Sequence, residues 1–403
     1  MLALVAPLAL AGANITDVSA PIAVDASASW PHPFARADGN WDFVTASQSS
    51  VTNAVFDASW KKVGGSSEIV ADSSLIDHSF ARCPDGTFLH VGMGTRASEK
   101  HSATVRHFDQ DWKLLNTKLA IDNDESAIVV DQPLVCGETF AGFAFTHFYS
   151  ELDPETRYLP ITADGDTQPD VAMESFFSPG GISLIDHKEH LYAVASDAGV
   201  SEFLRIVTID SDFHITDDHL IQMVEPQSIA YWPQGAVNVA GDFFVVFITQ
   251  TRADDWVDPY GNVVLAHFDE DWNLLETVPI FSEGPAMGAF QPTLEYSNGI
   301  LVAAFRLQTY VNNVVEISLE EFEPEPDPED TGVDSAGPED SADSGRVADD
   351  SGPSDTSQAA AADTSSKAAK SGGCGCASGG VSGIWLGLFG ASALRRRATR
   401  STV

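Results

Sequence analysis

Residues 107–115 read His-Phe-Asp-Gln-Asp-Trp-Lys-Leu-Leu, and residues 267–275 repeat them as His-Phe-Asp-Glu-Asp-Trp-Asn-Leu-Leu. Weaker copies stand at residues 55–60 and 208–213. In each copy an alternating apolar segment runs into an Asp-x-Asp or Asp-x-Ser turn, and an aromatic residue and a further strand-like segment follow. The pattern predicts a β-hairpin in which the aspartate caps the turn and the aromatic ring packs back over it.

A second kind of hairpin lies upstream of these copies. It consists of a short strand, a turn that usually contains Gly, and a strongly apolar strand. The six segments with this pattern are residues 33–44, 78–91, 132–143, 182–193, 234–246 and 291–302. Paired with the outer hairpins, they give six four-stranded units of about fifty residues, with no convincing amphipathic helix between them.

This repetition predicts an all-β fold over residues 30–322, namely a six-bladed β-propeller with four-stranded antiparallel blades. A two-sheet sandwich is the main alternative. A sandwich would not need an Asp–aromatic hairpin to return at such intervals, so the propeller is favoured.

The layout is similar to that of sialidase-like six-bladed propellers. In that family the turn between the outer strands carries an Asp box, Ser-x-Asp-x-Gly-x-Thr-Trp. Here the same place holds Phe-Asp-x-Asp-Trp, without the Gly and the Thr. The resemblance therefore implies the arrangement of the blades, and we do not carry the sialidase activity over to this chain.

Equivalent positions of the blades should form rings around a central channel. The starts of the inner strands supply one ring, made of His32, His78, Gln132, Gln234 and Gln291. The loops after the second strands supply a wider ring, which includes Arg96, His147, Asp197 and Arg252. Polar groups that converge at a channel mouth predict a ligand-binding site. The alternative is that they only satisfy strand ends through water.

Arg96 and Arg252 are the cations of this predicted mouth. A planar guanidinium suits a carboxylate or a sugar acid. Each arginine also has acids nearby in the sequence, such as Glu99 and Asp254, so an ordinary surface ion pair is an equally good interpretation.

No cofactor is expected, apart from calcium at one loop. Asp164, Asp166 and Asp170 place three carboxylates close together in the sequence. Calcium prefers six to eight oxygen ligands, and the loop lacks the full spacing of a known calcium motif. The Asp-x-Asp turns offer fewer ligands still, and turn capping explains them better.

Cys83 and Cys136 occupy matching places in adjacent predicted blades, just before the first hairpin turn. The sequence is compatible with two alternatives for these cysteines. They form either a disulfide between the two blades or a pair of buried free thiols. Catalytic residues stay unknown, because no Gly-x-Ser-x-Gly, P-loop or dinucleotide motif occurs. A glycosidase pair of carboxylates cannot be singled out among 59 Asp and Glu residues.

The 403 residues carry a formal net charge of −38. A chain this acidic repels phosphates and anionic membranes, so no nucleic-acid partner is expected. Residues 323–370 are rich in Pro, Ser and Asp and hold almost no large apolar side chains. They predict a disordered acidic linker that serves as a stalk.

Residues 371–403 combine Cys374 and Cys376, an apolar run over residues 381–394, and an arginine cluster. The run is shorter than the about 20 residues of a permanent span. The order of these parts resembles the C-terminal sorting tail of myxobacterial surface proteins (MYXO-CTERM). The resemblance implies export, processing near Cys374 and Cys376 by an envelope protease, and a place on the outer surface. A tail-anchored helix is the alternative.

Residues 1–13 are apolar and end in Ala11-Gly12-Ala13, which predicts a signal peptide cleaved after Ala13. A buried N-terminal strand is the alternative. Together these features favour an exported, surface-anchored propeller that binds a ligand or partner such as a glycan or a protein. A glycan-active hydrolase or lyase and a structural coat protein are the other candidates, and enzymatic activity is the less favoured reading.

Overall fold

The computed structural model describes residues 12–24, 29–47, 50–71, 75–96, 100–124, 127–128, 133–148, 154–162, 164–173, 182–196, 202–224, 228–251, 261–282 and 289–322. The chain divides into two units, residues 1–325 and 326–403, and all described residues belong to the first. The predicted linker over residues 323–370 and the sorting tail with Cys374 and Cys376 lie outside the described residues.

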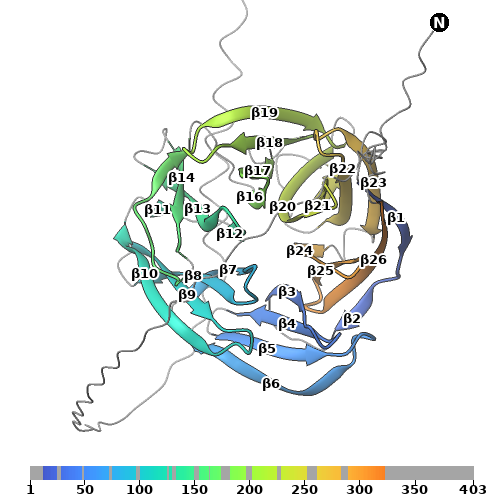
Figure 1. The fold of residues 1–403 in the computed structure, drawn as a ribbon. Coiled ribbons are helices and arrows are strands. Elements are labelled where there is room, and N and C mark those ends of the chain that lie inside the picture. Colours follow the sequence, from blue (N-terminus) through green and yellow to red (C-terminus); the bar gives the residue numbers. More distant parts are fainter. Residues whose placement is uncertain are drawn as a thin grey trace, which may run out of the picture. The chain divides into compact units, whose positions relative to one another are not determined.

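Six antiparallel sheets surround a central channel (Figure 1). Blades 1 and 2 comprise β3 (Ser29–Ala35), β4 (Trp41–Ala46), β5 (Ser50–Phe56), β6 (Lys62–Ala71), β7 (Leu75–Arg82), β8 (Phe88–Arg96), β9 (Lys100–Phe108) and β10 (Leu114–Asp124). Blades 3 and 4 comprise β11 (Ala127–Ile128), β12 (Leu134–Cys136), β13 (Ala141–Phe148), β14 (Pro154–Pro160), β15 (Val171–Met173), β16 (Ile182–His187), β17 (His190–Ser196), β18 (Phe203–Ile209) and β19 (Ile215–Gln222).

Blades 5 and 6 complete the circle. They comprise β20 (Ser228–Val239), β21 (Asp242–Thr251), β22 (Asn262–Phe268), β23 (Leu274–Phe281), β24 (Ala289–Ser297), β25 (Ile300–Leu307), β26 (Asn312–Phe322), β1 (Gly12–Val18) and β2 (Ile22–Val24). The innermost strands contact one another in the order β3, β7, β12, β16, β20, β24 and back to β3. This closed ring confirms the six-bladed propeller and excludes the two-layer sandwich.

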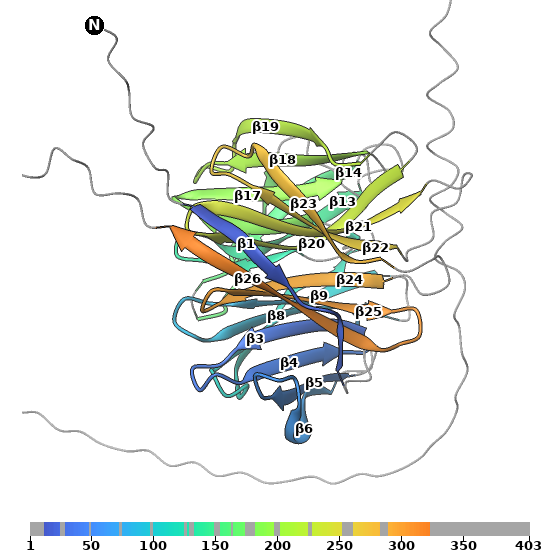
Figure 2. The same cartoon turned by 90° about the vertical axis from the view of Figure 1, so that its right-hand side faces the viewer.

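The N-terminal strands close the ring. β1 and β2 both pair with β26, with Gly12 opposite Phe322 and Val24 opposite Asn312, so both ends of the propeller share one sheet (Figure 2). The propeller therefore begins upstream of residue 30, where the sequence pattern placed its start. Blade 3 also departs from the regular pattern, because its inner position is split between β11 and β12, which both pair with β13.

Burial explains the apolar pattern of the blades. The second strand of a blade is covered on both faces by its neighbours, and β4 and β25 are buried along nearly their whole length. Such a strand needs a continuous apolar run. The outermost strands face solvent on one side, and most residues of β6 are exposed.

The Asp–aromatic turns join the third and fourth strands of blades 1, 2, 4 and 5. In blade 2, Asp109 Oδ1 accepts hydrogen bonds from the backbone N–H groups of Asp111 and Lys113, at 3.0 and 2.9 Å. Asp57, Asp210 and Asp269 cap their turns in the same way. The aromatic residue adopts a left-handed backbone conformation, with φ of 61°, 62°, 63° and 61° at Trp60, Trp112, Phe213 and Trp272. This is the αL position of a three-residue hairpin loop, which Gly usually fills.

Each aromatic residue of these turns packs against the preceding blade. Trp112 stacks on Phe88 and lies 5.7 Å, centroid to centroid, from Phe34 of blade 1. Trp272 lies 5.5 Å from Tyr192 of blade 4. Their side chains are 5% and 4% exposed. The repeated turn is therefore a joint between blades as well as a connection within one.

The remaining aromatic joints follow the same rule. Phe213 of blade 4 packs against Phe140 and Tyr158 of blade 3. The indole N–H of Trp60 in blade 1 donates a 2.8 Å hydrogen bond to Glu316 of blade 6. Four of the six seams of the ring therefore depend on one motif.

Candidate functional site

A cavity of about 530 Å³ occupies the central channel and is lined by residues of all six innermost strands. We call the end at which these strands begin the mouth, and the other end the floor. A cavity of this volume is in the range that takes a small ligand.

The inner strands carry bulges at the mouth. The pairing register shifts between Ser29 and Pro31 in blade 1, and corresponding shifts occur in blades 2, 5 and 6. Trp30 and Gln291 sit in two of these bulges with positive φ values of 50° and 53°. The Gln291 side-chain oxygen accepts a 3.1 Å hydrogen bond from the Trp30 N–H, across the seam between blades 6 and 1. Bulges and strained backbone of this kind are typical of places where side chains are aimed at a ligand.

Two stacked histidines form a hydrogen-bonded chain beside Trp30. His78 Nε2 lies 3.0 Å from the carbonyl oxygen of Ser47, and His78 Nδ1 lies 3.0 Å from His90 Nε2. Since a carbonyl only accepts, His78 Nε2 carries the proton. His78 Nδ1 and His90 Nε2 then share the second hydrogen bond of the chain, in which one ring nitrogen donates and the other accepts. His90 is fully buried, and its Nδ1 has no partner among the described residues.

The imidazoles of His32 and His90 stay neutral at pH 7. Burial, together with the nearby His78, lowers the pKa of His32 to about 3. Burial also lowers the pKa of His90 well below its usual value, with further contributions from His78, Arg106 and His32. These groups therefore act as neutral hydrogen-bonding partners at pH 7 and offer no positive charge to an anion.

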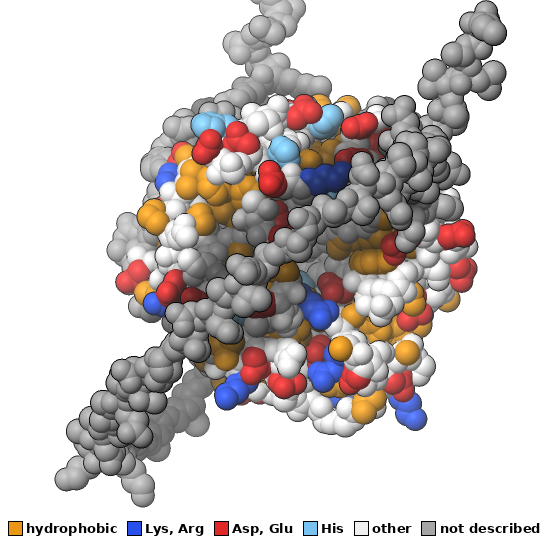
Figure 3. Space-filling model, in the orientation of Figure 1, with side chains coloured by type: hydrophobic (Ala, Val, Ile, Leu, Met, Phe, Trp, Pro, Cys, Tyr) orange, Lys and Arg blue, Asp and Glu red, His pale blue; other side chains and the backbone are white. Residues whose placement is uncertain are grey.

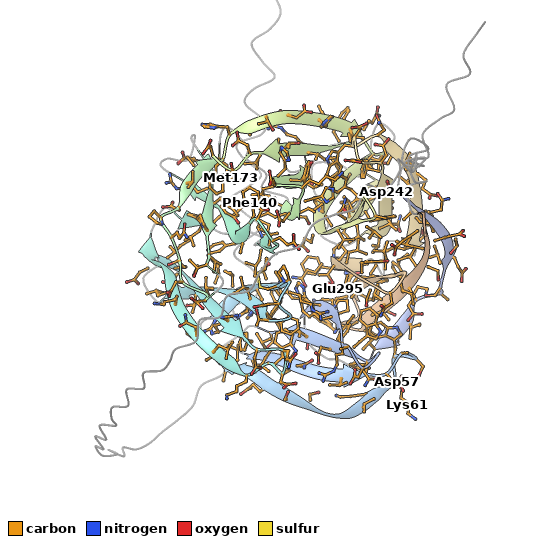
Figure 4. All side chains as sticks on the ribbon, in the orientation of Figure 1. Asp57, Lys61, Phe140, Met173, Asp242 and Glu295 are labelled. Carbon is orange, nitrogen blue, oxygen red and sulfur yellow. A yellow bond between two sulfur atoms is a disulfide. The ribbon has the colours of Figure 1, made fainter. Side chains whose placement is uncertain are left out.

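The floor of the channel holds charged and ionisable groups. Arg82, Asp186 and Glu295 line the cavity from blades 2, 4 and 6, and Glu295 lies beside the channel, whereas Asp57 lies at the rim (Figure 4). Burial raises the pKa of Glu295 to about 8, and the opposing effect of Arg82 is smaller. Glu295 is therefore mostly protonated at pH 7. A carboxylic acid in this state can donate a hydrogen bond or a proton.

The structure brings part of the predicted inner ring together. His32, His78, Gln234 and Gln291 all line the cavity. Gln132 lies outside the described residues.

The predicted outer ring is not defined at the level of its side chains. Arg96 ends β8 and His147 lies near the end of β13, and only the backbone of each is described. Asp197 and Arg252 lie outside the described residues. Their role at the mouth stays a prediction.

Two of the three aspartates of the predicted calcium loop, Asp166 and Asp170, form ion pairs with basic side chains, and Asp164 contributes a backbone oxygen to a hydrogen bond. Asp166 forms a 2.8 Å ion pair with Lys118, and Asp170 pairs with Arg157. The Asp164 backbone oxygen accepts a hydrogen bond from Asn116. No group of three or more His, Cys, Asp or Glu side chains suited to a metal occurs within the described residues. Calcium at this loop remains a prediction without support from this geometry.

Cys83 and Cys136 are joined by a disulfide bond that links blades 2 and 3 at the floor of the channel. The loop with Asp164 reinforces the same seam, because a Cβ atom on Gly165 would lie 2.9 Å from the Cβ of His107. Blade 3 lacks the Asp–aromatic joint, and these contacts stand in its place.

Four residues of the cavity that bear on its chemistry, Trp30, Arg82, Asp186 and Glu295, were not among the site residues predicted from the sequence. Trp30 lies two positions before His32 and enters the mouth only because of the bulge. Glu295 is one of 59 acids and nothing in its neighbourhood marks it.

No family model matches the sequence, and no curated protein matches it. Among solved structures, the chain is similar to a subtype N10 neuraminidase-like protein of A/little yellow-shouldered bat/Guatemala/060/2010. The TM-score is 0.46 at 10% identity, over 77% of this chain and 100% of that chain. A neuraminidase-like protein from A/bat/Guatemala/164/2009 gives 0.45 at 9% identity, over 76% and 94%.

NanB plus Optactamide gives a TM-score of 0.47 at 9% identity, over 72% of this chain and 67% of that chain. At these identities no activity is transferred to the present protein. No helix within the described part of the chain is long and apolar enough to cross a membrane. On the face that Figure 3 shows, acidic side chains are scattered among basic ones.

Proposed function

We propose that this protein is exported and held at the cell envelope, where the mouth of its propeller binds a neutral polar ligand, with a glycan as the best candidate. The observation that carries the proposal is the mouth itself. Half-buried Trp30, the neutral imidazole of His32 and the amide of Gln291 converge on one cavity from two blades. An aromatic face and neutral hydrogen-bonding groups suit the apolar face and the hydroxyls of a sugar.

The direction of the chain agrees with a stalked binding module. Adjacent strands of a blade are antiparallel, so β26, the third strand of blade 6, ends at the floor side of the ring. Phe322, the last described residue of the propeller, therefore lies on the face opposite the mouth. The predicted linker over residues 323–370 would serve as the stalk, and the sorting tail would supply the anchor after processing by an envelope protease.

A glycan-cleaving activity is the second candidate, because Asp186 and Glu295 line the same cavity and Glu295 is protonated at neutral pH. A general acid and a second carboxylate are the groups that glycosidic cleavage needs.

One experiment separates the two candidates. The exported protein is applied to a glycan array and to cell-surface polysaccharides, and reducing ends released from any bound glycan are measured. We expect binding that Trp30→Ala weakens at least tenfold, while Leu275→Ala, on the exposed outer strand β23, leaves it unchanged. Released ends that disappear in Glu295→Gln would instead establish cleavage. Equal loss in Trp30→Ala and Leu275→Ala, or no glycan bound, would contradict the proposal.

A further inference from the structure

Blade 6 has no turn between its third and fourth strands, because β26 ends the described chain and β1 begins it. Gly12 pairs with Phe322 at this point. In blades 1, 2, 4 and 5 the corresponding place holds the aromatic residue that packs on the preceding blade. In blade 6 the first residues of β1 take that place and reach blade 5.

The group they reach is the buried carboxylate of Asp242, at the start of β21. The backbone N–H of Ala13 donates a 2.9 Å hydrogen bond to Asp242 Oδ2, and His267 Nε2 lies 2.9 Å from the same oxygen. Asp242 is 5% exposed and His267 2% exposed. A Cβ atom built on Gly12 would lie 3.1 Å from Asp242 Oδ2. The N-terminal end of β1 therefore lies directly against this carboxylate (Figure 4).

Residues 9–11 read Ala-Leu-Ala immediately before Gly12, which is a small-x-small cleavage pattern. We infer that a peptidase of the export pathway cleaves the bond between Ala11 and Gly12, and that the new α-ammonium group of Gly12 pairs with Asp242. Water hydrolyses the amide, Ala11 leaves with the new carboxylate, and Gly12 keeps the nitrogen as an ammonium group. Processing thereby completes the seam between blades 5 and 6.

Electrostatics favours this site over the cleavage after Ala13 that the sequence pattern suggested. Cleavage after Ala13 would remove Gly12 and the N–H donor of Ala13, and it would take two residues from β1. A carboxylate as buried as that of Asp242 is costly unless charged or hydrogen-bonding groups surround it. An ammonium group adds a positive charge and three donors at this position.

The inference rests on the proposed export for its cleavage step, whereas the pairing can be tested apart from export. For the first step, the mature protein is isolated from the cell envelope and its N-terminus is sequenced. We expect Gly12. An N-terminus at Asn14, or a retained Met1, would overturn the cleavage.

For the pairing, a chain that starts at Gly12 is compared with one that keeps Leu10-Ala11 ahead of it. Both are also made with Asp242→Asn, which completes a double-mutant cycle. We expect the free Gly12 terminus to raise Tm by about 2–4 °C relative to the extended chain. The difference should vanish in Asp242→Asn. Equal Tm values for the two chains that keep Asp242 would overturn the pairing. The same Tm difference between the two Asp242→Asn chains would overturn it as well.

A second readout covers the case in which Asp242→Asn does not accumulate. The α-amine of the unmutated chain that starts at Gly12 is labelled with an amine-reactive ester at neutral pH. We expect slower labelling than for the α-amine of the chain extended by Leu10-Ala11. Labelling at the same rate would show that the ammonium group of Gly12 is free in solution, which contradicts the inference.

Discussion

Burial at the channel floor keeps the carboxyl group of Glu295 protonated at neutral pH. Its folded-state pKa of about 8 exceeds the ordinary value of 4.5. The folded state therefore binds a proton that the unfolded state has released between these values. Stability from this group is fully present below pH 4.5 and is lost as the pH rises toward 8.

This shift predicts a pH-dependent difference between the native protein and Glu295→Gln. The glutamine cannot ionise, so the variant should not lose stability through this group as the pH rises. The free energy of unfolding of the variant minus that of the native protein should therefore increase between pH 5 and pH 8. We expect a gain of roughly 1 kcal/mol per pH unit at most, since Arg82 and partial solvent access reduce it. Urea titrations of both proteins at several pH values measure the difference. A difference that does not change with pH would contradict the assignment.

Single residues of the site were predictable to different degrees. His32, His78, Gln234 and Gln291 were accessible to sequence reasoning because the repeat places them at equivalent positions, and all four line the cavity. Trp30 was not accessible, since a bulge has no fixed sequence signature. The ionisation state of Glu295 depends on residues that come from other blades, so no local pattern could reveal it.

Among the structural elements, the Asp–aromatic hairpin has two roles that depend on one short sequence. The aspartate caps the turn, and the aromatic ring fills the seam to the preceding blade. Trp112 shows both parts most clearly, since it stacks on Phe88 at 4.1 Å and belongs to a cluster that spans blades 1 and 2. The joint therefore couples the stability of neighbouring blades.

We predict that Trp112→Ala lowers the free energy of unfolding by about 3–5 kcal/mol, because the substitution leaves a large cavity at the seam. Leu115→Ala is the matched control, three residues along the same stretch and 53% exposed. It should cost less than about 0.5 kcal/mol. Denaturant titrations of both variants measure these values. Similar losses in the two variants would contradict the role of Trp112 as a joint.

The hairpins were predictable from sequence because strand alternation and turn residues are local signals. The repeat then gave the number of blades. The split inner position of blade 3 was not predictable, because β11 and β12 are too short to show a period. The sequence pattern assigns Gly12 and Ala13, the first two residues of β1, to the end of a signal peptide, with a buried strand as the alternative. The pairing of β1 with β26 was not predictable, since it joins residues about 300 positions apart, as in the pair Gly12 and Phe322.

At the scale of the whole molecule, the closed ring converts a linear repeat into a site. The mouth takes Trp30 from blade 1, His78 from blade 2 and Gln291 from blade 6, which meet only because β24 lies beside β3. Closure itself depends on β1, which joins the last sheet as its outer strand. A ring left open between blades 6 and 1 would lose the hydrogen bond between Trp30 and Gln291, and it would lose the proposed binding surface as a result.

Hydrogen exchange measured by mass spectrometry on the full chain tests this closure most directly. We expect the amides of β1 to exchange about as slowly as those of β26, and we expect deletion of residues 12–24 to make the amides of β26 exchange much faster. Rapid exchange throughout β1, or unchanged exchange in β26 after the deletion, would contradict a ring closed by the N-terminal strand.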